Sequence, residues 1–380
     1  MRVFDDFTLP GFWQDPFPAF KRSFLNGDRV QRSPDGGLAI LGHRALRAFG
    51  MHAAVDGTPM PDAPDEPCRN GDDILRHGLF TQTGFEHRRL RKAVLAGLNN
   101  AAVTGFAPDA RSVIDRWVAV ARDRHVDLFH DICLPIATEC WGAFAGYGSQ
   151  DAASLGEQVD VFSRQLSFAP DAADATAADC AAAELLRRSA EVIGSDRECP
   201  ARRIASVAGA AQGAPLVASL LFDAIDTAAA GLAGMLTVLL LEETDKLALA
   251  DPSYRELAIE EALRLATPTL FTVRQARVEA QIGDRSVAEG TLVWMWWSAG
   301  NRDPDVFPQP ALYRPGRSDR GLPFGIGAHS CVGHGWTKQL AHLLVEIAFC
   351  DGPALSPRSE HWTWAIGGAR RPVGLMVSQD

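Results

Sequence analysis

One cysteine near the C-terminus lies in a setting suited to chemistry. Cys331 stands in the stretch 323–333, where glycines at positions 325, 327 and 333 let the backbone come close to a bulky group. A helix is predicted to begin just after it, around residues 335–337, and backbone N–H groups at a helix N-terminus stabilise a thiolate. The setting predicts a metal ligand or a nucleophile, although a lone cysteine is more often simply buried.

The ten residues from Phe324 to Gly333 favour the metal ligand. They run Phe-Gly-Ile-Gly-Ala-His-Ser-Cys-Val-Gly and resemble the cysteine-loop signature of the cytochrome P450 family at every fixed position. By that resemblance Cys331 is the thiolate ligand of a haem iron, a ligation that favours O–O cleavage. The resemblance also implies that His329 contacts a haem propionate, that Phe324 shields the sulfur and that Gly333 belongs to the haem-binding loop.

Two further basic residues are spaced to act together. His87 and Arg91 are four apart on a predicted helix, so they share one face, which could also be an ordinary solvated surface. The family carries His-x-x-x-Arg at this place to hold haem propionates, and it places another propionate partner where Arg274 stands in a strand-like segment. The family's usual acidic-Pro-Pro before the helix is replaced here by Thr-Gly-Phe at positions 83–85.

The longest apolar stretch, residues 216–241, carries three polar groups on one side. Its length would suit a membrane span, but Asp223 and Asp226 near its middle favour a buried helix instead. Asp223, Asp226 and Thr227 lie at i, i+3 and i+4, where they could simply be buried groups that bend the helix. In the family the corresponding helix carries an acid–alcohol pair that relays protons, and Asp226 and Thr227 match that pair.

Asp223 departs from the family pattern. It replaces a small residue that faces the haem, and a carboxylate there is costly to bury unless it is paired or protonated. One hypothesis is that Asp223 contacts a polar or cationic part of the substrate, or an ordered water. The rival hypothesis is that it points away and satisfies backbone groups.

A predicted ion-pair trio supports the site. Glu261 and Arg264 are three apart on a helix, and such a pair on a surface contributes little to stability. The family has a buried pair at this place, joined by a later arginine, and Arg317 matches that third member. The resemblance implies a scaffold beneath the haem with no part in catalysis.

Turn-rich segments separate the predicted elements. Residues 30–33 and 38–41 predict a β-hairpin around Pro-Asp-Gly-Gly. Residues 55–75, rich in Pro, Asp and Gly, predict a mobile loop over the substrate, and residues 362–377 predict a terminal hairpin that reaches into the pocket. The substrate is expected to be surrounded by segments near 60–85, 150–190, 270–273 and 365–368.

The resemblance spans nearly the whole chain and implies a mainly helical fold with small β-sheets. We expect residues 1–380 to form one triangular haem-binding domain, because no linker or charge run divides the chain. The seven cysteines show no CxxC pairing, so neither a disulfide framework nor a zinc site is expected. This and an N-terminus without a signal-like segment predict a soluble protein of the cytoplasm.

The reaction implied by the resemblance is monooxygenation with O2 and two electrons on one haem b. Separate redox partners are expected, either a ferredoxin with its reductase or a flavodoxin, and the enzyme is expected to be a monomer. The net charge of −10 argues against nucleic acid or an anionic membrane as partner. Four cations, Arg88, Arg89, Lys92 and Lys338, are expected on the thiolate side, where they would attract an acidic ferredoxin or merely solvate their helices.

Two other classes of protein stay open. A peroxygenase would use hydrogen peroxide directly and usually lacks the acid–alcohol pair, so Asp226 and Thr227 speak against it while Asp223 keeps it open. A non-catalytic haem protein that binds a gas or ligand would need the thiolate but no proton relay.

Overall fold

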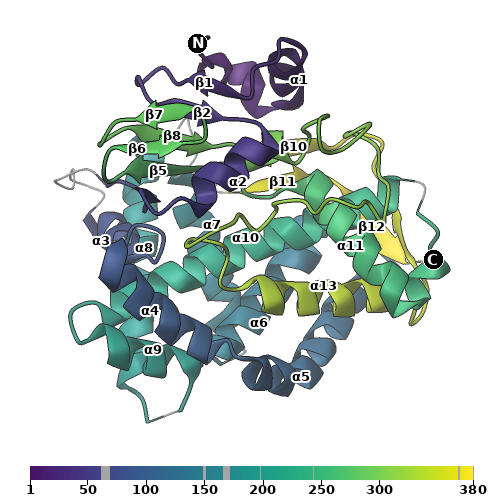
Figure 1. The fold of residues 1–380 in the computed structure, drawn as a ribbon. Helices are drawn as coiled ribbons and strands as arrows, with labels where there is room; N and C mark the ends of the chain where they lie inside the picture. The colour runs from purple at the N-terminus through teal and green to yellow at the C-terminus, as the bar shows by residue number, and fades with distance from the viewer. Residues whose placement is uncertain are drawn as a thin grey trace.

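One long helix, α10 (Gly213–Leu241), crosses the centre of the molecule, and the other elements are arranged around it (Figure 1). The computed structural model describes residues 1–60, 69–148, 151–165, 172–196, 198–242, 244–366 and 369–379. By length and composition α10 could cross a membrane, but 83% of its most apolar window is buried in the protein, as in a core helix. The prediction of a buried helix is confirmed.

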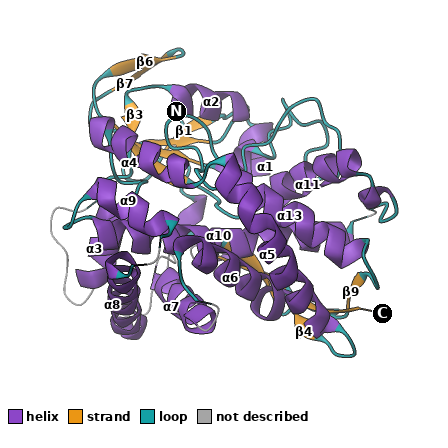
Figure 2. Cartoon of the chain, turned by 90° about the horizontal axis from the view of Figure 1, so that it is seen from below, coloured by secondary structure: helices purple, strands orange, loops and turns teal. Residues whose placement is uncertain are grey.

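The helices make up most of the fold (Figure 2). Short 3-10 turns occur at Asp6–Thr8, Pro10–Trp13, Ala119–Ala121 and Ala248–Ala250, and a π-helical segment, Leu128–Cys133, leads into α6. The remaining helices are α1 (Phe17–Leu25), α2 (His43–Met51), α3 (Arg69–His77), α4 (Gly84–Gly97), α5 (Asn100–Val118), α6 (Leu134–Ala145), α7 (Ala152–Gln165), α8 (Ala172–Gly194), α9 (Pro200–Ala208), α11 (Pro252–Ala266), α12 (Trp297–Gly300) and α13 (His334–Phe349). In Figure 1, α4, α5, α6 and α9 lie on the side of α10 away from the largest sheet, whereas α1 and α2 lie beside that sheet.

The strands form small sheets, as predicted. The largest has the order β1-β2-β8-β5-β3, in which only β2 and β8 are parallel. Val30 faces Ile40 across the first pair, which confirms the N-terminal hairpin. The strands are β1 (Val30–Arg32), β2 (Leu38–Ile40), β3 (Val55–Asp56), β4 (Val126–Asp127), β5 (Thr272–Ala276), β6 (Ala280–Ile282), β7 (Arg285–Val287), β8 (Leu292–Met295), β9 (Leu355–Pro357), β10 (Thr363–Ile366), β11 (Arg370–Val373) and β12 (Met376–Gln379).

The loop predicted over residues 55–75 is wrong at both ends. The segment begins as β3, because Val55 pairs with Ala276 of β5. It ends in α3, which lies against α8 (Figures 1 and 2). The side chain of Asp179 on α8 accepts hydrogen bonds from the first backbone N–H groups of α3, at Asn70 (2.7 Å) and Gly71 (3.0 Å). Both elements depend on partners more than 100 residues away, so local composition did not show them, and residues 61–68 lie outside the described part of the chain.

A buried polar scaffold links α11 to the cysteine loop. Glu261 Oε1 accepts hydrogen bonds from Arg264 Nη2 (2.7 Å) and Arg317 Nε (2.8 Å), so the predicted trio does assemble. Arg264 also donates to the backbone oxygen of Asn301 (2.6 Å), and Asn301 Oδ1 accepts from the N–H of Leu322 (2.6 Å). Because every charge has partners, the trio can hold the residues just before the cysteine loop without an unpaired buried group.

Candidate active site

The cysteine loop is shaped by its glycines. Gly325 and Gly327 have φ of 64° and 82°, and a Cβ on Gly327 would lie 1.8 Å from the backbone oxygen of Gly50. Glycine is therefore required at position 327. The backbone N–H of Cys331 donates to the oxygen of Phe324 (2.9 Å), which closes the loop and places the cysteine just before α13.

Cys331 is exposed, and it lines both cavities described below. Burial raises the pKa of this thiol, and the charge of Asp223 acts in the same direction. The backbone N–H groups of Gly333 and His334 and the guanidinium of Arg91 oppose that rise. These groups favour the thiolate at the start of a helix, which is the form that binds a metal.

Two cavities meet at this cysteine. The larger has a volume of about 570 Å³ and the smaller about 160 Å³. Their walls share Thr227, Arg274, His329 and Cys331. Phe324 lines the smaller cavity, and Gly333 lines the larger one so close to Trp141 that a Cβ would lie 2.9 Å from its ring.

Four basic side chains gather at one end of the larger cavity: His87, Arg91, Arg274 and His329. The rings of His87 and His329 stack with centroids 3.9 Å apart. Burial lowers the pKa of His87, and it lowers that of Arg274 to about 10 and that of His329 to about 4. His87 Nε2 and Arg274 Nε are buried with no hydrogen-bond partner in the described structure, so this end of the cavity suits an anionic ligand.

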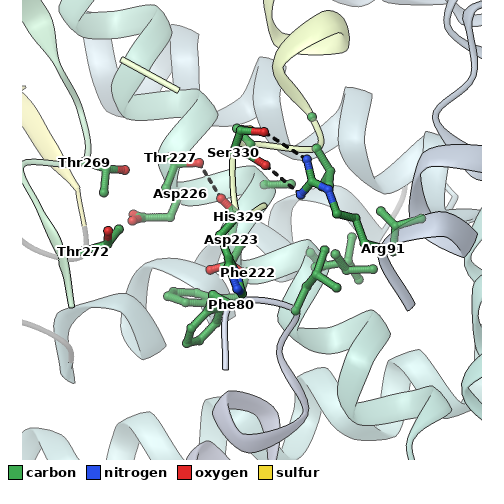
Figure 3. Close-up of a pocket in the computed structure, with 18 of the residues that line it drawn as sticks. Phe80, Arg91, Phe222, Asp223, Asp226, Thr227, Thr269, Thr272, His329 and Ser330 are labelled. Carbon is green, nitrogen blue, oxygen red and sulfur yellow. Dashed lines mark hydrogen bonds between the residues drawn. The ribbon is translucent and has the colours of Figure 1, made fainter. Parts of the chain in front are cut away.

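Arg91 ties α4 to the cysteine loop. Its guanidinium donates to the backbone oxygen of Ser330 (2.8 Å) and to Ser330 Oγ (3.1 Å), as Figure 3 shows. A change at Arg91 would therefore disturb both the cavity and the residue next to Cys331.

An acidic residue, Asp56, contacts the group of four basic side chains, and no pattern in the sequence predicts it. His329 Nε2 lies 2.5 Å from Asp56 Oδ1, and the N–H of Gly84 donates to Asp56 Oδ2 (3.0 Å). Burial acts to raise the pKa of Asp56, but the hydrogen bonds from Gly84 and His329 outweigh it and hold that pKa below its ordinary value. Asp56 fell within the predicted loop, and an isolated acid there gave no signal.

The acid of the predicted acid–alcohol pair is held by residues from distant segments. Ser163 Oγ on α7 donates to Asp226 Oδ1 (3.1 Å), and Arg371 Nη1 on β11 lies 3.7 Å from the same oxygen. Arg371 Nη2 also lies 2.9 Å from Asp160 Oδ1. Burial raises the pKa of Asp226 to about 6, although Arg371 and Ser163 act to lower it.

The other two polar groups of α10 are arranged differently. Thr227 Oγ1 donates to the backbone oxygen of Asp223 one turn earlier (2.5 Å), as Figure 3 shows. The side chain of Asp223 lines the larger cavity. Burial raises the pKa of Asp223 to about 7, and repulsion from Asp226 adds to the rise.

The cavity wall differs in part from the predicted one. Phe80 and residues 268–274 line it, as expected for two of the four predicted segments. Among the described residues, however, neither 150–190 nor the terminal hairpin contributes to the wall, which instead includes α9 and the first half of α10. Gly367 and Gly368 lie outside the described residues.

Two of the four cations predicted to attract a partner are already paired. Lys338 forms ion pairs with Glu256 and Glu260, and Arg89 pairs with Glu86. These ion pairs balance the charges of Arg89 and Lys338 within the fold, and attraction of a ferredoxin stays a prediction. Arg88 and Lys92 are exposed on α4.

A sequence model described as cytochrome P450 matches residues 242–349. The chain is 26% identical to a C-19 steroid 1alpha-hydroxylase of Sorangium cellulosum over 324 residues, which cover 79% of this chain and 80% of the relative. It is also 26% identical to cytochrome P450 107B1 of Saccharopolyspora erythraea over 355 residues, or 89% and 85% of the two chains.

The fold is likewise similar to solved structures. P450BioI, solved in complex with an acyl carrier protein carrying hexadec-9Z-enoic acid, superposes with a TM-score of 0.88 at 19% identity, covering 97% of this chain and 100% of that one. The predicted mainly helical architecture with small sheets is thus confirmed as the fold of these proteins.

Proposed function

Because the chain belongs to the cytochrome P450 family of monooxygenases, we propose that it is a haem-thiolate enzyme that oxidises a small organic molecule with O2 and two electrons. The name of the relative from Sorangium cellulosum indicates a hydroxylase, which supports hydroxylation as the outcome here. The observation that carries the proposal is that Cys331 and four basic side chains face one cavity.

The residues present fit a haem b. Cys331 would bind the iron, and the basic group of His87, Arg91, Arg274 and His329 would hold the two propionates. The propionates would supply hydrogen-bond acceptors and negative charge to the nitrogen atoms that have no partner at that end of the cavity. When bound, the haem supplies the oxidation chemistry, while the protein positions the substrate and excludes water.

Two polar groups of α10, Asp226 and Thr227, would transfer protons to the cavity. The pKa of Asp226, raised to about 6 by burial, suits a group that gives and regains a proton near neutral pH. The hydroxyl of Thr227 lies on the cavity wall beside it and can pass that proton on. Ser163 and Arg371 would hold Asp226 in place for this step.

Electrons would come from separate proteins, a ferredoxin with its reductase or a flavodoxin. Arg88 and Lys92 offer exposed positive charge on α4, and the adjacent face of the same helix carries His87 and Arg91. We further propose that the chain works in the cytoplasm as a monomer. We also propose that it forms one domain, because α10 packs against helices from both halves of the sequence.

The first test is the difference spectrum of the dithionite-reduced protein with and without carbon monoxide. A strongly red-shifted Soret band is expected for cysteine-thiolate haem, and Cys331→His should move the band to the ordinary haem position. Absence of any haem band would contradict the proposal.

A second assay separates the three classes of haem protein. Product formed only with ferredoxin, reductase and O2 is the expected result. Product formed with hydrogen peroxide alone would favour the peroxygenase, for which the cavity acid Asp223 is the supporting observation. Product in neither case would favour a non-catalytic haem protein.

A further inference from the structure

Asp223 is a partly buried acid in the cavity wall, and no described cation pairs with it. Its side chain lines the larger cavity, and no hydrogen bond joins its carboxylate to the described residues. Resting on the proposed monooxygenase function, we propose that the substrate is a hydrophobic amine whose positively charged nitrogen pairs with Asp223.

The neighbouring acid on the same helix shows what a paired carboxylate looks like here. Asp226 has Ser163 and Arg371, and Asp160 in turn has Arg164 and Arg371. At Asp223, Thr227 Oγ1 donates to the backbone oxygen, and none of the described residues forms a hydrogen bond with the carboxylate. A ligand that fills the cavity would remove water from this carboxylate, which costs free energy unless the ligand supplies a partner, and a cation is the partner that compensates best.

None of the described basic residues serves as that partner. The four basic side chains of the cavity lie at the end that includes His329, where Asp56 already contacts His329 and Arg91 donates to Ser330. The charge that influences Asp223 most is the like charge of Asp226, which together with burial raises its pKa to about 7. A cation bound in the cavity would relieve both effects and hold Asp223 ionised.

The rest of the wall suits the body of a hydrophobic amine. Phe80 and Phe222 line the same cavity, and Figure 3 shows them with Asp223. Leu79, Leu220 and Ile204 extend the apolar surface. Aromatic faces attract a cation as well as an apolar chain, so the wall around Asp223 can bind both parts of such a molecule.

The test uses matched probes that differ only in charge. Phenylalkyl trimethylammonium ions, with two, four or six methylene groups between ring and nitrogen, are compared with neutral isosteres in which carbon replaces nitrogen. A quaternary nitrogen has no lone pair, so it cannot bind the iron directly. Affinity is measured on the haem-loaded protein by calorimetry and by the change in the Soret band.

We expect the wild type to prefer the best cationic probe by about tenfold over its isostere, which corresponds to about 1.4 kcal/mol. Asp223→Asn keeps the shape of the side chain and should abolish this preference. Asp226→Asn should retain it, because the charge of Asp226 is already paired in the protein.

Equal affinity for the two members of each pair, failure of all three cations to bind, or a preference that survives Asp223→Asn would overturn the proposal. Loss of preference in Asp226→Asn alone would do so too, since it would assign the charge to the wrong residue. A normal thiolate band in carbon monoxide with no cation preference would reject the substrate class and leave the monooxygenase function standing. Absence of that band would reject the function itself.

Discussion

Asp223 and Asp226 lie three residues apart on α10, yet their surroundings give them different energetic roles. Asp226 is buried and Asp223 is partly buried in the cavity wall, and loss of contact with water raises the pKa of Asp223 to about 7 and that of Asp226 to about 6. Each pKa lies above the ordinary aspartate value of 3.8. The unfolded chain therefore releases these protons at a lower pH than the folded protein does. The contribution of these two groups to the free energy of unfolding is therefore fully present below about pH 4, and it is lost as the pH rises toward 7.

Asp223→Asn is expected to stabilise the haem-free protein at alkaline pH only. Near pH 8 the substitution should raise the free energy of unfolding by roughly 2–4 kcal/mol, because it removes a buried charge, and near pH 4 it should change little. Urea unfolding at several pH values measures the difference. Asp284→Asn is the control, because that side chain is 92% exposed. Equal stabilisation at both pH values would contradict the assignment.

Arg371 stabilises two buried carboxylates at once, so its removal should be costly. Arg371→Met is expected to lower the free energy of unfolding by about 3–5 kcal/mol, because Asp160 and Asp226 lose a cation. Adding Asp160→Asn should restore part of the loss. Chemical denaturation measures both effects. Arg203→Met, at an arginine whose side chain is 71% exposed, should cost less than about 0.5 kcal/mol, and a similar cost at both arginines would refute the prediction.

At the scale of elements, one side chain of α8 binds the first residues of α3. Asp179 accepts three hydrogen bonds from the first residues of α3, two from Asn70 and one from Gly71. Because α3 contributes Leu75 to the cavity wall, loss of this contact should loosen part of the wall.

Asp179→Ala is expected to increase hydrogen exchange in residues 69–77 by about tenfold to a hundredfold, since each lost hydrogen bond contributes about 1 kcal/mol. Exchange in α13 should stay unchanged. Glu191→Ala, at a 63% exposed side chain on the same helix, is the matched control. Unchanged exchange in α3 would show that other contacts hold it.

The elements predicted well were those fixed by local pattern. The cysteine loop, α4 with His87 and Arg91, and α10 all follow from motifs or from a long apolar run. The missed features depend on pairing between distant segments. β3 has two residues and exists through β5, and Arg371 reaches Asp226 from the terminal hairpin. No spacing in the sequence encodes such contacts, so Asp56, Ser163 and Arg371 could be found only in the structure.

At the scale of the whole molecule, the net charge of −10 opposes an acidic redox partner, so any attraction must come from a local patch. Ion pairing within the fold decides which cations can attract an acidic redox partner. Glu256 and Glu260 neutralise Lys338, and Glu86 neutralises Arg89. Arg88 and Lys92 remain exposed on α4, without an ion pair in the described structure, and they concentrate positive charge on one helix face.

We therefore expect Arg88→Ala combined with Lys92→Ala to slow reduction by an acidic ferredoxin about tenfold at low salt. The difference should shrink toward zero near ~0.5 M salt, where charges more than a few ångströms apart are screened. Lys338→Ala should have a much smaller effect, because its charge is already balanced by two glutamates. Stopped-flow reduction over a range of ionic strength measures all three proteins. If the rates were insensitive to salt, or if Lys338→Ala matched the double variant, steering by α4 would be rejected and docking would have to depend on apolar contact or on another face.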